Sequence, residues 1–126
     1  MYGLDGRIYE QGTADFIISQ TDALIKGFNT AGGFFTGFNQ NQISVGLPAC
    51  SGAAGGGYII PDSVKAAIKY LRGTGPKPGI YSLTTLYPNL KGMMTWSINW
   101  DANTGCHNRY EFSRNYQNIF FNCYRY

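Results

Sequence analysis

Aromatic and small polar residues alternate along the segment Lys91–Asp101, and this arrangement suits contact with a sugar. The polar members are Thr95, Ser97, Asn99 and Asp101, and the apolar members are Trp96, Ile98 and Trp100. An aromatic ring can cover the apolar C–H face of a sugar, while small polar groups bond its hydroxyl or amide rim. The pattern predicts a carbohydrate site at the end of a strand, and a core tryptophan on an ordinary strand fits it equally well.

Two strands are predicted to position this segment. Met93–Trp96 is an apolar run bounded by Gly92, which predicts a buried strand. A second strand is predicted over residues 42–47, with alternate apolar side chains on one face, and Pro48 ends its ladder. The glycine-rich stretch Ser51–Gly57 that follows predicts a loop.

Helices are predicted before, between and after these strands. The clearest is Pro61–Arg72, which opens with a proline, carries apolar residues at helical spacing and stops at Gly73. Weaker patterns predict helices over residues 15–28, 80–90 and 110–121. The residues expected to pack on the last helix are Tyr110, Tyr116, Ile119 and Phe120. This mixture of strands and helices indicates an α/β fold.

The two strand segments resemble those of a known enzyme family. Lys91–Asp101 is similar to the eighth barrel strand of the chitinases of glycoside hydrolase family 18, and Gln42–Ala49 is similar to their seventh. Gly55–Tyr58, followed by a helix, also fits the bacterial members. The segments stand in the family's order with a helix between them, as a (β/α) repeat requires. The resemblance implies one partial catalytic domain over residues 1–126, the C-terminal part of a (β/α)8 TIM barrel.

The same resemblance implies a role for Trp96. In the family, the tryptophan of the eighth strand forms the floor under the sugar at the cleavage subsite, so Trp96 is the substrate-binding residue expected here. Trp100 is a weaker candidate, because packing of the strand's end against a neighbouring loop explains it equally well. Asn99 and Asp101 could bond a sugar, but such residues more often satisfy loop backbone. The candidate rim aromatics are Tyr2 and Tyr58.

The family's catalytic signature, Asp-x-x-Asp-x-Asp-x-Glu, is absent from this chain. In the family the final Glu is the general acid, and the nearest Asp positions the acetamido group that attacks the anomeric carbon in a substrate-assisted mechanism. None of the seven acidic residues here places an Asp two positions before a Glu. No catalytic residue is therefore assigned to this chain, and the acid is expected to lie outside it.

Length and composition argue against several other classes of protein. A complete barrel needs about 250 residues, and this chain has 126. The formal charge of +3 comes from scattered Lys and Arg rather than a basic run, so no nucleic acid partner is expected. No apolar stretch approaches the ~20 residues of a membrane span, so no membrane partner is expected. The N-terminus lacks the regions of a signal peptide, and an extracellular location is implied by the resemblance alone.

Three cysteines, Cys50, Cys106 and Cys123, leave two alternatives open. An exported protein would pair two of them and leave one free, whereas the other alternative is three unpaired thiols. His107 follows Cys106, but it is the only histidine, and no second ligand pair has suitable spacing. No metal site and no cofactor are predicted.

Two functional hypotheses follow. The first is a chitinase piece that contributes the sugar floor while another segment contributes the acid needed to cleave chitin or chitooligosaccharide. The second is a non-catalytic barrel fragment that holds chitin or chitooligosaccharide without cutting it. Two barrel strands alone would leave unpaired edges and bare apolar faces, so the remaining N-terminal part of the barrel is the expected partner. Without that part, self-association or a remnant that does not fold is expected.

Overall fold

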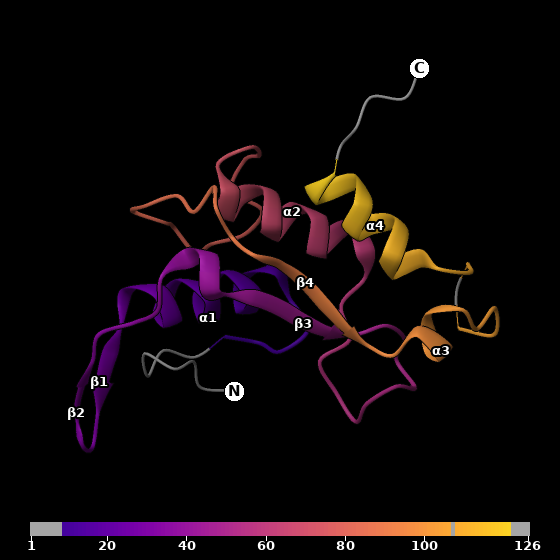
Figure 1. Ribbon diagram of the computed structural model, residues 1–126, viewed down its shortest axis with the longest axis horizontal. Coiled ribbons are helices and arrows are strands. Elements are labelled where there is room, and N and C mark those ends of the chain that lie inside the picture. The colour runs from indigo at the N-terminus through magenta and orange to yellow at the C-terminus, as the bar shows by residue number, and fades with distance from the viewer. Residues whose placement is uncertain (1–8, 107, 122–126) are drawn as a thin grey trace.

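The computed structural model describes residues 9–106 and 108–121, and a two-stranded parallel sheet crosses its centre (Figure 1). The sheet joins β3 (Ser44–Pro48) to β4 (Gly92–Trp96), in register from Ser44 opposite Gly92 to Pro48 opposite Trp96. The predicted strand pair is confirmed. The first strand starts two residues later than expected, because a short 3-10 helix, η1 (Gln40–Gln42), precedes it.

The crossover between the two parallel strands contains α2 (Pro61–Arg72), which has the predicted bounds. Proline stands in its first turn, where a missing N–H costs nothing, and Gly73 ends it in the left-handed conformation. Its apolar stripe is buried as the spacing requires; the buried residues are Val64, Ala67, Ile68 and Leu71.

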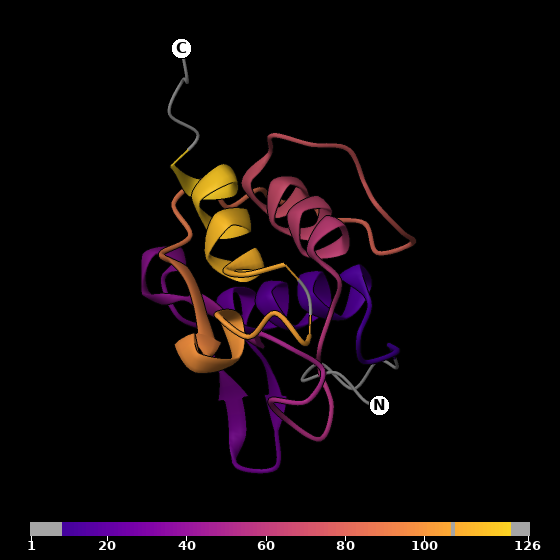
Figure 2. The same ribbon diagram turned by 90° about the vertical axis from the view of Figure 1, so that its right-hand side faces the viewer.

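Two further helices flank α2. α1 (Ala14–Lys26) begins after Thr13, whose side chain accepts a hydrogen bond from the amide of Phe16 at 3.3 Å, and it stops at Gly27. α4 (Glu111–Phe120) lies beside α2 in both ribbon views (Figures 1 and 2). None of the described helices is long and apolar enough to cross a membrane.

The contact between α2 and α4 includes a basic side chain. Arg72 donates from Nη1 to the carbonyl of Ile119 at 2.9 Å, and its guanidinium lies 4.5 Å from the centre of the Phe120 ring. Ile119 is buried as predicted, but Tyr110 is 42% exposed, so the expectation that it packs with this helix is wrong. Tyr110 precedes the helix with a positive φ of 58°, which turns the chain before the helical face begins.

The helices cover one face of the sheet. Met93 on β4 is buried among residues of α1, α2 and α4, whereas Met94 and Trp96 are exposed. Successive side chains of a strand point to opposite faces. The core therefore lies between the helices and the Met93 face, and the opposite face is open in the described chain.

The helix predicted over residues 80–90 is not formed. Its backbone is held instead by α1, because the Asp15 carboxylate accepts hydrogen bonds from the amides of Ile80 and Tyr81 at 3.1–3.2 Å. The amide of Tyr87 donates to the carbonyl of Leu71 on α2 at 2.6 Å. These bonds to other elements replace the i to i−4 bonds that a helix would need.

An antiparallel hairpin that was not predicted follows α1. It consists of β1 (Phe28–Thr30) and β2 (Gly33–Phe35), and it extends away from the body of the molecule (Figure 1). Gly37 lies at its base with φ +86°, and a Cβ there would stand 2.1 Å from the carbonyl oxygen of Ile25. The hairpin is thus anchored where only glycine fits.

Candidate functional site

Trp96 ends β4 with its side chain exposed. Its relative exposure of 68% excludes a core tryptophan within the described chain. The ring borders a shallow hollow of about 230 Å³, whose lining residues are Gly46, Leu47, Pro48, Met94 and Trp96. Gly46 leaves this space free, because a Cβ there would lie 3.3 Å from the terminal methyl of Met94.

The hollow lies at the carboxyl edge of the sheet. β3 and β4 run parallel and end opposite each other at Pro48 and Trp96, and the amide of Ala49 donates to the carbonyl of Trp96 at 3.1 Å. The glycine-rich loop Ser51–Gly57 leaves from the end of β3. Ligands of α/β proteins bind at this edge of a sheet, so Trp96 has the position expected of a binding residue.

A second hollow of about 230 Å³ adjoins the first and shares Gly46, Leu47 and Pro48 with it. Gln11 also lines this second hollow. Its side-chain Nε2 would lie 3.4 Å from a Cβ added at Gly57, and its Oε1 would lie 3.4 Å from a Cβ added at Gly56. Sequence reasoning missed Gln11. It stands in a polar segment before α1, and no pattern there distinguishes one amide from its neighbours.

Trp100 has a different environment from Trp96. It lies on α3 (Ile98–Asp101), a single helical turn that was not predicted, and its side chain is half-buried. The ring packs against the loop after β3, since a Cβ at Gly52 would lie 3.0 Å from it. This is the packing of the strand's end against a neighbouring loop that the sequence offered as the alternative to sugar contact.

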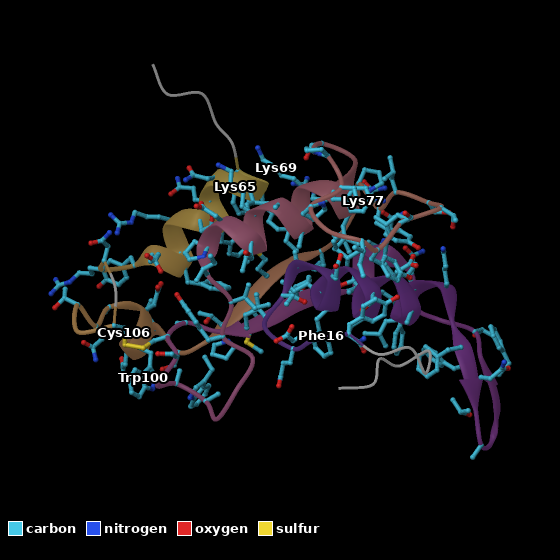
Figure 3. All side chains as sticks on the ribbon, turned by 180° about the vertical axis from the view of Figure 1, so that it is seen from behind. Phe16, Lys65, Lys69, Lys77, Trp100 and Cys106 are labelled. Carbon is cyan, nitrogen blue, oxygen red and sulfur yellow. A yellow bond between two sulfur atoms is a disulfide. The ribbon has the colours of Figure 1, made fainter. Side chains whose placement is uncertain are left out.

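A disulfide joins Cys50 to Cys106 across 56 residues. Figure 3 shows it next to Trp100, at the end of the molecule away from the β1–β2 hairpin. The alternative of three unpaired thiols is therefore wrong. Cys123 lies outside the described residues, as do two other residues singled out from the sequence, Tyr2 and His107.

Asp101 is fully buried and bonded to the start of α4. Its carboxylate accepts hydrogen bonds from the amides of Phe112 and Ser113 at 2.8 and 3.1 Å, and from the Ser113 hydroxyl at 2.5 Å. These bonds satisfy amides that the first turn of a helix leaves unpaired. Asp101 thus has the backbone-satisfying role that was the alternative to sugar binding, whereas Asn99 is exposed.

Tyr58, a candidate rim aromatic, is directed toward α4. Its hydroxyl donates to Oε1 of Glu111 at 3.4 Å, and the ring lines a small cavity with Pro61 and Val64. Burial, reinforced by the Glu111 carboxylate, raises the pKa of Tyr58 above its ordinary value. Tyr58 therefore keeps its proton at neutral pH and acts as a hydrogen-bond donor.

The chemistry available at the Trp96 hollow is binding rather than proton transfer. None of its lining residues carries a titratable group. Within the described ranges, no three His, Cys, Asp or Glu side chains come together as a metal site. An exposed indole beside small residues can cover the face of a sugar ring, but it cannot donate a proton to a glycosidic oxygen.

The chain is similar in sequence to known chitinases. It is 47% identical over 109 residues to Chitinase Chi52 of Paenibacillus xylanexedens and 48% identical over 109 residues to Chitinase D of Niallia circulans. Each alignment covers 82% of this chain and 21% of the relative, so the chain spans about a fifth of the length of these curated relatives. No protein-family model matches the chain.

Solved structures agree with these relatives. A family GH18 chitinase from Chromobacterium violaceum superposes with a TM-score of 0.74 at 33% identity, over 86% of this chain and 28% of that one. A protein from Streptomyces coelicolor described as chitinase A superposes with a TM-score of 0.70 at 38% identity, over 91% of this chain and 35% of that one. By sequence and by fold, this chain is a homologue of the chitinases of glycoside hydrolase family 18, a family of TIM barrels, and corresponds to part of their length.

Proposed function

We propose that this chain is the C-terminal part of the catalytic barrel of a chitinase and supplies the floor of its sugar site. The observation that carries the proposal is the exposed Trp96 ring at the carboxyl end of β4, beside a hollow with no titratable group. In this proposal β3 and β4 are barrel strands seven and eight, and residues 1–126 are one partial domain. The substrate is chitin or chitooligosaccharide, whose N-acetylglucosamine ring stacks on Trp96.

The proton donor for the reaction lies outside this chain in the proposal. The two carboxylates that follow Trp96 in the chain have other partners, because Asp101 caps α4 and Glu111 accepts from Tyr58. The substrate-assisted mechanism of the family needs a carboxylic acid beside the scissile bond. The chain alone is therefore expected to bind the β-1,4-linked substrate without hydrolysing it.

The partner that completes the site is the remaining N-terminal part of the barrel. Among the described residues, β3 and β4 pair only with each other, so each strand has one unpaired edge. An apolar hollow of about 190 Å³ lies between α1 and β3, where Ile17, Leu24 and Val45 are among the lining residues. A neighbouring parallel strand would bond the free edge of β3 and cover these side chains.

An extracellular site of action is also part of the proposal. Disulfides persist in oxidising environments and are rare in the cytosol of most organisms. The Cys50–Cys106 bond supports secretion of the protein that contains this chain. Chitin, a polymer that cannot enter cells, is a substrate consistent with that location.

The test is binding of N-acetylglucosamine oligosaccharides to this chain, measured by calorimetry so that the tryptophan under study is not also the reporter. Trp96→Ala is expected to weaken binding at least about tenfold, which corresponds to the ~1.4 kcal/mol of one stacking contact. Ile98→Ala removes another exposed apolar side chain nearby and is expected to leave affinity unchanged.

Hydrolysis gives the second readout. The chain alone is expected to release no product, and activity is expected only when the part of the barrel carrying the acid is added. Equal affinity in Trp96→Ala and the unmodified chain would refute the role of the ring. Hydrolysis by the chain alone would refute the placement of the acid. Binding that never leads to hydrolysis, even with the rest of the barrel present, would indicate a non-catalytic binding fragment.

A further inference from the structure

The loop Ser51–Gly57 borders the proposed sugar site along one side. It leaves from Cys50, one residue beyond Ala49, whose amide is bonded to the carbonyl of Trp96. Its last glycines, Gly56 and Gly57, line the hollow that adjoins the Trp96 hollow. The conformation of this loop therefore shapes the hollow next to the one that the Trp96 ring borders.

The loop's own sequence gives it little rigidity. Four of its seven residues are glycine and two are alanine. Glycine loses more conformational freedom on ordering than any other residue, so this segment needs outside restraints to stay in one conformation. Two hydrogen bonds of its backbone go to Cys50: the Ala53 amide donates to the carbonyl oxygen at 2.9 Å and the Gly52 amide to Sγ at 3.4 Å.

The segment after β4, far from the loop in the sequence, supplies two such restraints. The disulfide ties Cys50, at the start of the loop and 2% exposed, to Cys106 in the segment after β4. From that same segment, the Trp100 ring packs over Gly52, where a Cβ would come within 3.0 Å of it. Figure 3 shows Trp100 and Cys106 together at this end of the molecule.

We propose that the Cys50–Cys106 disulfide and Trp100 form a clamp that fixes the loop Ser51–Gly57 beside Trp96 and thereby sets the affinity for N-acetylglucosamine oligosaccharides. The inference rests on the proposed function, because it assumes that Trp96 carries the sugar. Trp100 and the two cysteines are positioning residues here, since they act through the loop. A dithiol reductant opens the clamp: it gives two electrons and two protons to the disulfide, yields two cysteine thiols and itself becomes a disulfide.

The experiment compares the unmodified chain with the double variant Cys50→Ser/Cys106→Ser and with Trp100→Ala and Trp100→Phe. Cys123→Ser is the control, because it also replaces a cysteine by serine but keeps the clamp. Amide hydrogen exchange reports on the loop, and calorimetry with chitooligosaccharide reports on the site. In the double variant and in Trp100→Ala, exchange in the loop is expected to rise at least about tenfold. The affinity of these two variants for the oligosaccharide is expected to fall several-fold. Trp100→Phe keeps an aromatic ring over Gly52, so its changes in exchange and in affinity are expected to be smaller than those of Trp100→Ala.

Exchange of the β4 amides separates loosening of the loop from general destabilisation. They are expected to stay protected in every variant, because the ladder with β3 does not involve the disulfide. Unchanged exchange in the loop, or a loosened loop with unchanged affinity, would overturn the clamp. If the unmodified chain binds no oligosaccharide, the proposed function fails and the affinity claim fails with it. The exchange data then decide separately whether the clamp holds the loop.

Discussion

Replacing Tyr87 with phenylalanine removes one hydroxyl from a buried polar cluster that joins α1 to the segment before β4. Tyr87 is 3% exposed and donates to Oδ1 of Asp22 at 2.5 Å, while Tyr81 donates to Oδ2 at 2.6 Å. The carboxylate, itself 2% exposed, has Lys26 as a third partner, with Nζ 3.3 Å from Oδ2. The cluster fixes a segment whose backbone forms no regular element.

These contacts determine how much unfolding free energy we expect Tyr87→Phe to lose. A hydrogen bond to a charged group contributes about 1.5–3 kcal/mol, and loss of the Tyr87 hydroxyl leaves Asp22 with two other partners. We therefore expect Tyr87→Phe to lower the free energy of unfolding by about 2 kcal/mol. Adding Tyr81→Phe should cost more than the sum of the single changes, because the buried carboxylate then retains only the partly exposed Lys26.

Urea unfolding followed by circular dichroism measures this loss, provided that the m-value stays constant across the variants. Tyr58→Phe is the matched control. It also removes a phenolic hydroxyl that donates to a carboxylate, but that bond to Glu111 is 3.4 Å long and the tyrosine is half-buried. The control is expected to lose less than about 1 kcal/mol. If Tyr87→Phe loses no more than Tyr58→Phe, the Asp22 cluster does not hold the segment.

Three further predictions concern other parts of the chain. Burial, and after it the hydrogen bond to Asp22, raises the pKa of Tyr87 above its ordinary value of 10.0. The protonated tyrosine therefore stabilises the fold below pH 10.0, and this part of the unfolding free energy should be lost as the pH rises above 10.0. Unfolding curves at increasing pH should show a smaller loss in Tyr87→Phe. Gly37→Ala should lower the unfolding free energy by about 2 kcal/mol or more, because Gly37 has a φ of +86° and a Cβ there would stand 2.1 Å from the carbonyl oxygen of Ile25. A Cβ at Gly55 would have nothing within 4 Å, so Gly55→Ala should change the unfolding free energy by less than about 0.5 kcal/mol in the same assay. Asp101→Ala should cost about 2 kcal/mol by uncapping α4, and a loss similar to that of the exposed Asn99→Ala would contradict the capping role.

Local patterns predicted the elements whose folding depends on their own residues. α2 could be placed to the residue, because proline at its start, glycine after its end and a single apolar stripe all agree. The strand pair followed from two apolar segments, and the resemblance to a barrel family supplied their parallel order. The exposed position of Trp96 did not follow from the pattern, which fits a core residue equally well.

The predictions that failed or stayed open concern segments whose structure depends on residues far away in the sequence. A helix was expected over residues 80–90, but Asp15 and Asp22 on α1 bind that segment from about 60 positions away. No local pattern shows such contacts. The pairing of Cys50 with Cys106 depends likewise on β3 and β4 ending at the same edge of the sheet.

The alternation along β4 separates two kinds of mutational sensitivity. Met93 contacts the helices of this chain, so a substitution there can be compensated by a second change within the same 126 residues. Met94 and Trp96 face the other way and share their hollow with Gly46, Leu47 and Pro48 of β3. A genetic screen for suppressors should therefore return changes on the helices for Met93, and changes on β3 or in whatever covers the open face for Met94 and Trp96.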